Sequence, residues 1–368
     1  MISDQEFFNS IDLNYQGLDS ANAAISQGDT ALAKIKLLEY FQERNTTQYF
    51  PLYSGGSTSD ANDNLNHYFT VVNIRKYAGE SDGTVDWTKY DPDNDEWHYQ
   101  FHRNYWLSNL GKVYGSTNNE IYAIEWIAEL TDWIDNNSPG YPRTLDTGIR
   151  LKNWVESYQY FINLYDSPSI TAEDHLTVLK SLIEQCRFLR DNWRDEGNWG
   201  ATETQGLGAA VVMFPEFKFT VDGNWEWWRD LVIARMQHHL ETDFYPDGVQ
   251  FETSPLYHSY EFRNLFLNYK LMDLNRITIS DNLIDLFVKP LEFMTHIHKP
   301  DGYLPQLSDT DNKNFLNRLE EGADLFGRQD MLYAATRGSQ GTPPENTLAP
   351  FPDGGYFVMR SDWGQNQS

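Results

Sequence analysis

Apolar residues recur every three or four positions through most of this chain, which is the spacing of one face of an α-helix. Asp29 precedes one such stretch, and Thr171 opens another with the capping-box sequence Thr-Ala-Glu-Asp. The residues expected on buried helix faces are Leu32, Ile35, Leu38 and Phe41 in one stretch, Ile124, Ile127, Ala128 and Ile134 in a second, and Leu176, Leu179, Ile183 and Cys186 in a third. Further helices are expected near residues 145–165, 203–213, 225–241, 258–273, 281–297 and 328–337.

Glycine and proline clusters separate these stretches at residues 138–140, 246–248 and 300–302, where they predict turns. Helices joined by short connections pack as antiparallel pairs, so the pattern predicts an all-α protein built of helical hairpins. A bundle, a solenoid and a closed ring of hairpins all fit. The chain shows no self-similarity at a fixed period, which disfavours the solenoid.

Two segments depart from the helical pattern. Within residues 51–100, the stretches 51–64 and 77–97 are polar and rich in Gly and Asp, and they predict long ordered loops. Near the end, Tyr356 to Met359 follow a Gly-Gly turn and read as a β-strand. A single strand cannot satisfy its own edges. Either this strand pairs with an earlier segment, or it begins a β domain that this chain largely lacks.

Composition narrows the class of protein. The 368 residues include 28 Lys and Arg against 54 Asp and Glu, a net charge of −26, which argues against nucleic acid as a partner. No apolar run reaches the roughly 20 residues of a membrane helix. The single cysteine, Cys186, excludes an internal disulfide framework, and its apolar neighbours predict a buried core residue. The N-terminus has no signal-peptide pattern, which fits a cytoplasmic protein or one whose signal has been removed.

Three segments hold residues suited to chemistry. In residues 197–203, Asn198 is either a helix N-cap or an amide aimed into a cleft beside Glu203. In residues 247–260, polar-tipped rings gather near Glu252 and are either core or site. In residues 97–106, cationic and aromatic side chains could grip carboxylates or sulfates, or form a structural cluster. The members of the last two groups are Tyr257, His258 and Tyr260, and His98, His102, Arg103 and Trp106.

Other motifs point weakly to metals. His98 and His102 have chelating spacing but lack a partner glutamate, and the pairs His238–His239 and His296–His298 fit packing roles. Asp309, Asp311 and Asn312 could bind calcium, although a turn rich in Asp is the ordinary interpretation. The sequence therefore shows no clear metal site, and calcium is the one candidate cofactor.

The order of these segments resembles the α-helical domain of the heparinase II/III-like polysaccharide lyases, most closely the heparinase III branch. The resemblance covers nearly the whole chain. Its matching segments are residues 13–44, 96–114, 144–154, 198–218, 247–260 and 351–364. It implies an incomplete (α/α) toroid over residues 1–345, followed at residues 346–368 by the first strand of a truncated antiparallel β-sandwich. It also implies a monomeric protein, periplasmic or secreted, whose partner is an acidic polysaccharide or oligosaccharide.

The resemblance further implies cleavage of uronic-acid polysaccharides by β-elimination. Carried over by position, Asn198 would neutralise the uronate carboxylate, aided by Glu203, and Tyr257 would act as general acid or as both acid and base. Substrate-binding roles fall to His102, Arg103, Trp106, Arg150, Asn153, Trp199, Glu252, His258 and Tyr260.

Two departures from the family qualify this expectation. The family commonly has His directly after the catalytic Asn, where this chain has Trp199. A further catalytic His comes from the β-sandwich, and the chain ends where that domain would begin. We therefore expect a fragment that binds oligosaccharide and cleaves it poorly or not at all.

Two other functions stay open. Glu203 and Glu252 could be the facing carboxylates of an (α/α)-barrel glycoside hydrolase, which leaves Asn198 and Tyr257 without a role. The chain could also be a non-catalytic carbohydrate-binding module. The charge of −26 opposes any polyanionic substrate at long range, so a sparsely sulfated or unsulfated polymer is the expected substrate.

Overall fold

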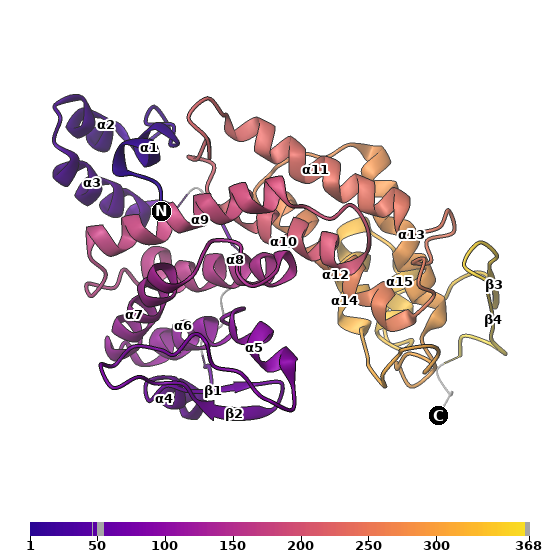
Figure 1. Cartoon of the computed structure of the whole chain (residues 1–368). Helices are drawn as coiled ribbons and strands as arrows, with labels where there is room; N and C mark the ends of the chain where they lie inside the picture. The colour runs from indigo at the N-terminus through magenta and orange to yellow at the C-terminus, as the bar shows by residue number, and fades with distance from the viewer. Residues whose placement is uncertain (46, 50–54, 365–368) are drawn as a thin grey trace. The chain divides into compact units, whose positions relative to one another are not determined.

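A computed structural model describes every residue except 46, 50–54 and 365–368. In this part of the chain helices predominate, with two small antiparallel hairpins (Figure 1). The elements are α1 (Asp4–Asn9), α2 (Asp19–Ser26), α3 (Thr30–Glu43), α4 (Thr58–Asn64), β1 (Tyr68–Val71), β2 (Ile74–Tyr77), α5 (Asp95–Phe101), α6 (Trp106–Thr117), α7 (Ile121–Asn136), α8 (Thr144–Tyr158), the π-helix η1 (Gln159–Leu164), α9 (Ala172–Asp191), α10 (Gly197–Met213), α11 (Trp225–Thr242), α12 (Pro255–Leu274), α13 (Asp281–Ile297), α14 (Leu316–Phe326), α15 (Gln329–Ala335), β3 (Leu348–Phe351) and β4 (Tyr356–Met359).

The chain divides into two compact units. Unit 1 comprises residues 1–193, 203–232 and 271–276, and unit 2 comprises residues 194–202, 233–270 and 277–368. Helices α10, α11 and α12 each contribute residues to both units. This division follows packing and does not test the predicted boundary at residue 345, which stays a prediction.

The predicted helices are confirmed, but two of their buried faces were assigned wrongly. In α9 the predicted face is correct, because Leu176, Leu179, Ile183 and Cys186 are all buried, and the Thr171 side chain accepts from the Asp174 N–H as an N-cap. In α3 the buried residues are Ala33, Leu37 and Phe41, whereas Leu32 and Ile35 are exposed. In α7 the buried set is Tyr122, Ala123, Trp126, Ile127, Glu129, Leu130 and Trp133, whereas Ile124 is exposed.

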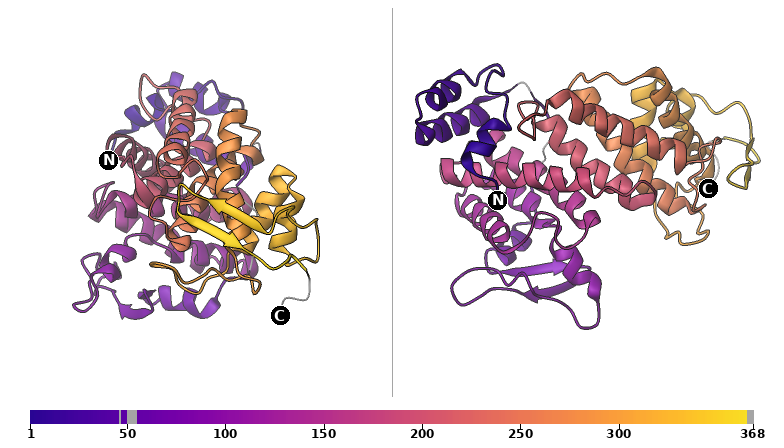
Figure 2. Two further views of the ribbon diagram at one scale, coloured as in Figure 1. Left: turned by 90° about the vertical axis from the view of Figure 1, so that its right-hand side faces the viewer. Right: turned by 45° about the horizontal axis from the view of Figure 1, so that its top comes forward.

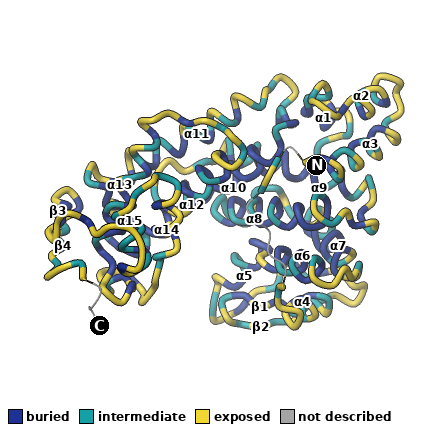
Figure 3. Tube along the Cα trace, turned by 180° about the vertical axis from the view of Figure 1, so that it is seen from behind, coloured by how far each residue is buried: buried dark blue, intermediate teal, exposed yellow. Residues whose placement is uncertain are grey.

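Tryptophan burial explains the orientation of α7. Trp126 and Trp133 are both 1% exposed, and burying an indole removes far more apolar surface from water than burying an isoleucine. Both indole nitrogens find partners inside unit 1, since Trp126 donates to Ser157 Oγ and Trp133 donates to His102 Nδ1. Figure 3 shows the resulting buried stretches along α7, α8 and α9 in dark blue. Helix α7 therefore turns toward the side that buries its indoles.

The predicted loop at residues 77–97 is confirmed over residues 78–94, whereas the loop predicted at residues 51–64, of which 51–54 lie outside the described part, contains a helix. That helix is α4, and between the two predicted loops lies the β1–β2 hairpin, which was not predicted. The hairpin turns through Val72 and Asn73, with φ of 46° and 62°, and pairs Val71 with Ile74. A two-residue turn of this kind normally contains Gly, so a Val-Asn turn gave no recognisable signal in the sequence.

The predicted strand at residues 356–359 is confirmed as β4, and it pairs with the earlier strand β3. Figure 2 shows the two strands side by side. Ala349 and Phe351 of β3 join Val249, Phe293 and Ile297 in one buried apolar cluster of unit 2. The strand thus satisfies one edge within this chain and packs its apolar face on helix α13.

A buried ion pair crosses unit 1. Arg44 Nη1 lies 2.6 Å from Glu216 Oε1, and the two side chains are 2% and 0% exposed. Arg44 Nη2 donates to the Met213 carbonyl, and the Tyr40 hydroxyl donates to Glu216 Oε1. The pair ties the end of α3 to the segment that follows α10.

We expect Arg44→Met to destabilise the protein by about 3–5 kcal/mol, because it leaves the Glu216 carboxylate buried without its cation. Urea denaturation followed by circular dichroism would measure the loss. Arg75→Met, in the exposed pair with Asp63, is the control and should leave the midpoint close to that of the wild type. Equal midpoints for both variants would contradict this account.

Candidate functional site

Asn198 lies inside the first turn of α10 rather than before it. The helix begins at Gly197, whose φ of 69° favours glycine, and Asn198 is the second helical residue. The N-cap interpretation of Asn198 is therefore wrong. The Asn198 side chain is half-buried, and its backbone carbonyl accepts a hydrogen bond from Thr202 Oγ1 at 2.6 Å.

The start of α10 is held by a buried aspartate. The Gly197 N–H donates to Asp243 Oδ2 at 2.9 Å, and His239 Nδ1 donates to the same oxygen at 2.6 Å. His239 is fully buried and Asp243 is 2% exposed. A Cβ added at Gly200 would lie 2.6 Å from His239 Cε1, so glycine there allows the His239 ring to pack against the helix. Asp243 and His239 thus fix the backbone on both sides of Asn198.

Glu261 continues this network toward the second motif. It is fully buried, and Gln250 Nε2 donates to its Oε2 at 3.0 Å. Burial raises the pKa of Glu261 well above its ordinary value, and hydrogen bonding to Asp243 raises it further. Burial alone would raise the pKa of Asp243, but hydrogen bonds from His239 and Glu261 outweigh burial and lower it. The pair therefore consists of an ionised Asp243 and a protonated Glu261 that donates to it.

Gln250 connects the network to the segment that carries Tyr257. Its side-chain carbonyl accepts the Glu252 N–H at 2.9 Å, and its own N–H donates to His258 Nδ1 at 3.3 Å. His258 Nε2 lies 3.2 Å from the Pro290 carbonyl, which assigns its ring proton to Nε2. Hydrogen bonds thus link the residue before Asn198 with the residue after Tyr257, entirely within unit 2.

Tyr257 lies in the first turn of α12, which has a strong start signal. Ser254 precedes Pro255, the first helical residue, and the Tyr257 N–H lies 3.5 Å from Ser254 Oγ. Thr310 Oγ1 lies 3.2 Å from Ser254 Oγ and accepts the Leu256 N–H at 3.3 Å. Tyr257 is half-buried. Its backbone position is therefore fixed while part of its side chain reaches solvent.

The residue before this cap is strained. Thr253 has a φ of 54°, an uncommon conformation for a β-branched residue. The Tyr356 hydroxyl of β4 donates to the Thr253 carbonyl at 2.5 Å. Asp247 Oδ2, in the preceding turn, accepts the N–H groups of Asp353 and Gly354 at 2.7 and 3.0 Å. The β3–β4 hairpin therefore braces the segment that leads to Tyr257.

The other predicted residues of unit 2 differ in exposure. Glu252 and Tyr260 are exposed. Trp199 is half-buried, with the Arg194 guanidinium 4.1 Å from its ring centroid. His258 is 1% exposed, and burial lowers its pKa to about 3. It is a neutral packing residue, so it supplies no positive field to Tyr257.

The predicted residues of unit 1 are engaged in its interior. Arg103 Nε donates to Asp146 Oδ1 at 2.7 Å, and the indole of Trp106 donates to Glu129 Oε2 at 2.6 Å. Asn153 Nδ2 donates to the Arg103 carbonyl at 2.8 Å. All three are less than 10% exposed. A role in substrate binding stays a prediction for them, and the contacts described above hold the interior of unit 1 together.

His102 and Arg150 are both fully buried. Burial lowers the pKa of His102 to about 3, so its imidazole is neutral. The Arg150 guanidinium donates to the carbonyls of Pro139 and Tyr141 at 2.7 and 2.6 Å, and burial lowers its pKa to about 9. Glu203, five residues after Asn198, is fully buried and belongs to unit 1. Direct contact of substrate with His102, Arg150 or Glu203 stays a prediction. The burial of these side chains disfavours such contact.

Among the described residues, one group of His, Asp and Glu side chains is close enough to share a metal ion, namely His239, Asp243 and Glu261. His239 Nδ1 and Asp243 Oδ2 lie 2.6 Å apart, a hydrogen-bond distance. Two ligands at about 2.0–2.2 Å from a tetrahedral ion would be roughly 3.3 Å apart. The trio is therefore organised as a hydrogen-bond network.

The remaining metal candidates have other partners. His98 Nδ1 and Nε2 lie 2.8 and 2.9 Å from the Lys89 carbonyl and the Tyr141 hydroxyl. His238 Nε2 lies 2.7 Å from the Asp195 carbonyl. Asp309 and Asp311 are exposed on either side of the buried Thr310. Calcium at this turn stays a prediction.

The network residues Asp243, Glu261 and Gln250 were not among the predicted site residues, and His239 was assigned to packing. One signal was present: His239 and Asp243 are four residues apart, near the end of α11, so they share a face. Their partner Glu261 comes from α12, and no local pattern announces that contact.

Comparison with known proteins identifies the family. The model of a family described as Heparinase II/III N-terminus matches residues 7–333. A heparin-sulfate lyase of Pedobacter heparinus is 27% identical, over 98% of this chain and 57% of that protein. A heparin-sulfate lyase of Bacteroides stercoris is 26% identical, over 98% of this chain and 58% of that protein. The chain thus spans under two thirds of the length of these relatives.

Solved structures support the fold. A crystal structure of heparinase III has a TM-score of 0.87 at 24% identity, covering 99% of this chain and 60% of that one. A heparinase III with methylated lysines has a TM-score of 0.82 at 25% identity, with the same coverage. The N-terminal domain of heparinase III is an α toroid, so the predicted fold class is confirmed. No described helix is long and apolar enough to cross a membrane.

The pKa of Glu261 generates a prediction about pH and stability. In the unfolded chain this carboxyl ionises near pH 4.3, whereas in the folded protein it keeps its proton to well above that value. Between these two pKa values the folded protein holds a proton that the unfolded chain has lost. The free energy of unfolding therefore falls as pH rises above about 4.5, by up to ~1.4 kcal/mol per pH unit, until the pKa of the folded state is reached.

Glu261→Gln should remove this fall, because its amide can still donate to Asp243 and its carbonyl can still accept from Gln250. Urea denaturation at several pH values between 4.5 and 8 would measure the difference from the wild type. Glu320→Gln, at an exposed position of α14, should keep the pH dependence of the wild type. A parallel dependence in Glu261→Gln would contradict a protonated Glu261.

Proposed function

Because the chain belongs to the heparinase II/III family, we propose that it belongs to a polysaccharide lyase that cleaves a uronic-acid-containing polysaccharide, heparan sulfate or a related glycosaminoglycan, by β-elimination. The names of its relatives support this substrate class. Such a substrate is extracellular, which supports a periplasmic or secreted protein.

One observation carries the proposal. Asn198 and Tyr257 each lie in the first turn of a helix, half-exposed, and one buried network holds the backbone beside both. A catalytic pair needs fixed backbones, because misplacement by about 1 Å can cost 10²-fold in rate. A purely structural role would not require an amide and a phenol that both reach the surface.

The chemistry assigns one task to each residue. The Asn198 amide donates to the uronate carboxylate, which makes the C5 proton more acidic. A base removes that proton, its electron pair forms the C4–C5 double bond, and the C4–O bond breaks. The Tyr257 hydroxyl gives its proton to the departing glycosidic oxygen. We propose Tyr257 as the acid, and as the base where a neighbouring cation stabilises its phenolate.

The remaining predicted residues take supporting roles. Glu252, Tyr260 and the Trp199 ring are proposed to contact the saccharide, since each has exposed surface. His258 is proposed to position Tyr257 through its bond to the Gln250 N–H. The substrate-binding role of five buried residues of unit 1 and the role of Glu203 beside Asn198 stay predictions, and their burial favours support of the site over direct contact. The five are His102, Arg103, Trp106, Arg150 and Asn153.

We expect Tyr257→Phe to abolish the ultraviolet absorbance of the unsaturated uronate product while changing substrate affinity less than threefold, because only the proton donor is lost. The absorbance assay and calorimetric titration of an oligosaccharide would measure the two effects. Tyr245→Phe, in the exposed turn before Val249, removes the same hydroxyl and should retain activity.

Three outcomes would count against the proposal. Full turnover in Tyr257→Phe would refute the assignment of the acid. Reducing ends without unsaturation would indicate the glycoside hydrolase alternative. Oligosaccharide binding without turnover in the wild type would indicate a carbohydrate-binding module.

A further inference from the structure

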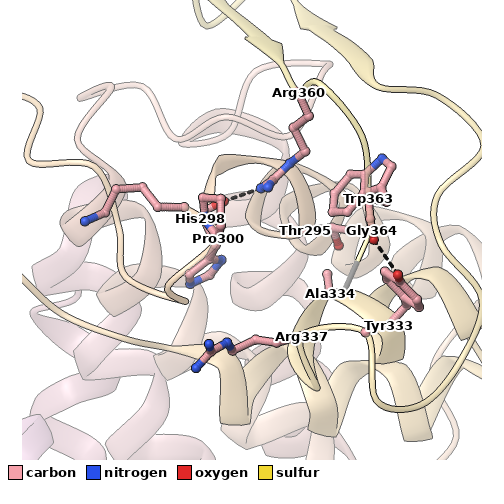
Figure 4. Close-up of a pocket in the computed structure, with 11 residues that line it drawn as sticks. Thr295, His298, Pro300, Tyr333, Ala334, Arg337, Arg360, Trp363 and Gly364 are labelled. Atoms are coloured by element: carbon pink, nitrogen blue, oxygen red, sulfur yellow. Dashed lines mark hydrogen bonds between the residues drawn. The ribbon is translucent and has the colours of Figure 1, made fainter. Parts of the chain in front are cut away.

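Unit 2 contains a pocket that is lined by no residue of the Asn198 and Tyr257 segments. Its cavity of about 70 Å³ is open to solvent and lies between the end of α13, the end of α15 and the chain that follows β4. Figure 4 shows Arg360 reaching down toward His298, Arg337 below them, and Tyr333 and Trp363 together on the opposite side. The pocket thus has a cationic side and an aromatic side.

The cationic side is unusual in so acidic a chain. The lining includes Lys299, Arg337 and Arg360 and contains no Asp or Glu, although acidic residues outnumber basic ones by 54 to 28 in the whole sequence. Lys299 pairs with Asp301 at 3.1 Å. Among the described residues, neither Arg337 nor Arg360 makes an ion pair with a carboxylate. Two guanidinium charges therefore remain for an anion.

Arg337 is held at this position by the backbone. It follows α15 with a φ of 54°, in the left-handed region that residues other than glycine rarely adopt. Gly338 follows with a φ of 83°, and its N–H donates to the Tyr333 carbonyl at 2.8 Å. Strained residues of this kind cluster at ligand sites. The conformation directs an exposed arginine to the pocket wall.

Two polar nitrogens of the wall have no hydrogen-bond partner among the described residues. They are Arg360 Nε, a donor, and His298 Nε2. His298 Nδ1 lies 2.6 Å from the Met294 carbonyl, and burial lowers the pKa of His298 to about 4, so its Nε2 is a neutral acceptor. Buried polar groups are normally satisfied. A ligand that has an oxyanion beside a hydroxyl would satisfy both nitrogens.

The aromatic side is rigidly placed. The Tyr333 hydroxyl donates to the Trp363 carbonyl, and the Trp363 indole donates to the Asn346 carbonyl at 3.0 Å. Arg360 is held over the Trp363 ring at 4.3 Å and donates to the carbonyls of His296 and His298. Aromatic rings of this kind pack against the apolar faces of sugars.

We propose that this pocket binds one anionic sugar residue, with its sulfate or carboxylate at Arg337 and Arg360 and its ring against Tyr333 and Trp363. The identity of the ligand rests on the proposed lyase function. The pocket also bears on the net charge of −26, because it offers a polyanion one place where the local charge is positive.

Calorimetric titration of the protein with three probes would test the proposal: a sulfated uronic-acid disaccharide, its unsulfated counterpart and inorganic sulfate. We expect the sulfated disaccharide to bind, and Arg337→Ala to weaken its binding about tenfold, because one charged hydrogen-bond donor is lost. Arg337→Lys should recover part of the affinity. Alanine keeps a Cβ at the positive φ, so the variant adds no new backbone strain.

One control separates loss of this pocket from a general loss of positive charge. Arg263→Ala removes the same charge at an exposed position of α12 that does not line the pocket, and it should bind like the wild type. Because this readout is binding, it holds even if the protein forms no unsaturated product.

The remaining outcomes either overturn the proposal or identify the anionic group that the pocket binds. No binding to the wild type, or equal affinity in Arg337→Ala and Arg263→Ala, would overturn it. Inorganic sulfate binding as tightly as the disaccharide would overturn the assignment to a sugar. Equal affinity for both disaccharides would assign the anionic group to the carboxylate, and preference for the sulfated one would assign it to the sulfate.

Discussion

The buried carboxylate of Asp243 is the constraint on which the proposed site depends. An ionised carboxylate away from water must be fully hydrogen-bonded, and Asp243 meets this need with the Gly197 N–H, the His239 ring and the protonated Glu261. Each donor comes from a different helix or helix start. Satisfying one charge therefore fixes the beginning of α10 relative to α11 and α12 within unit 2.

The need to pair buried charges also explains why many polar residues of the chain are not available to a ligand. Arg44 neutralises the buried Glu216, and Arg150 satisfies loop carbonyls that would otherwise lack partners. Arg103 pairs with the buried Asp146. In a chain with so few basic residues, each cation used inside a unit leaves fewer for a polyanionic ligand. The guanidinium groups of Arg337 and Arg360, which form no ion pair with any carboxylate of the described residues, are therefore notable.

The sequence predicted helices well where several signals agreed. In α9 the Thr171 cap and the apolar stripe coincide, so both its start and its buried face were predicted correctly. Helix α7 has apolar residues on more than one side, and the stripe of isoleucines was chosen although the tryptophans are the buried face. The β1–β2 hairpin was missed because its turn lacks glycine. The sequence also placed Asn198 and Tyr257 near helix starts, and both lie in the first turn of a helix, while their role in a site stays a prediction.

The sequence alone determined the helical class, the family and the two segments that hold Asn198 and Tyr257, because these depend on spacing and order along the chain. Only the tertiary structure decided what surrounds them. Glu261 meets Asp243 across two helices, and His298, Arg337 and Arg360 meet from three separate segments. Contacts between distant segments follow from packing and from the need to pair buried charges. They leave no periodicity in a single stretch of sequence, so the structure was needed to reveal them.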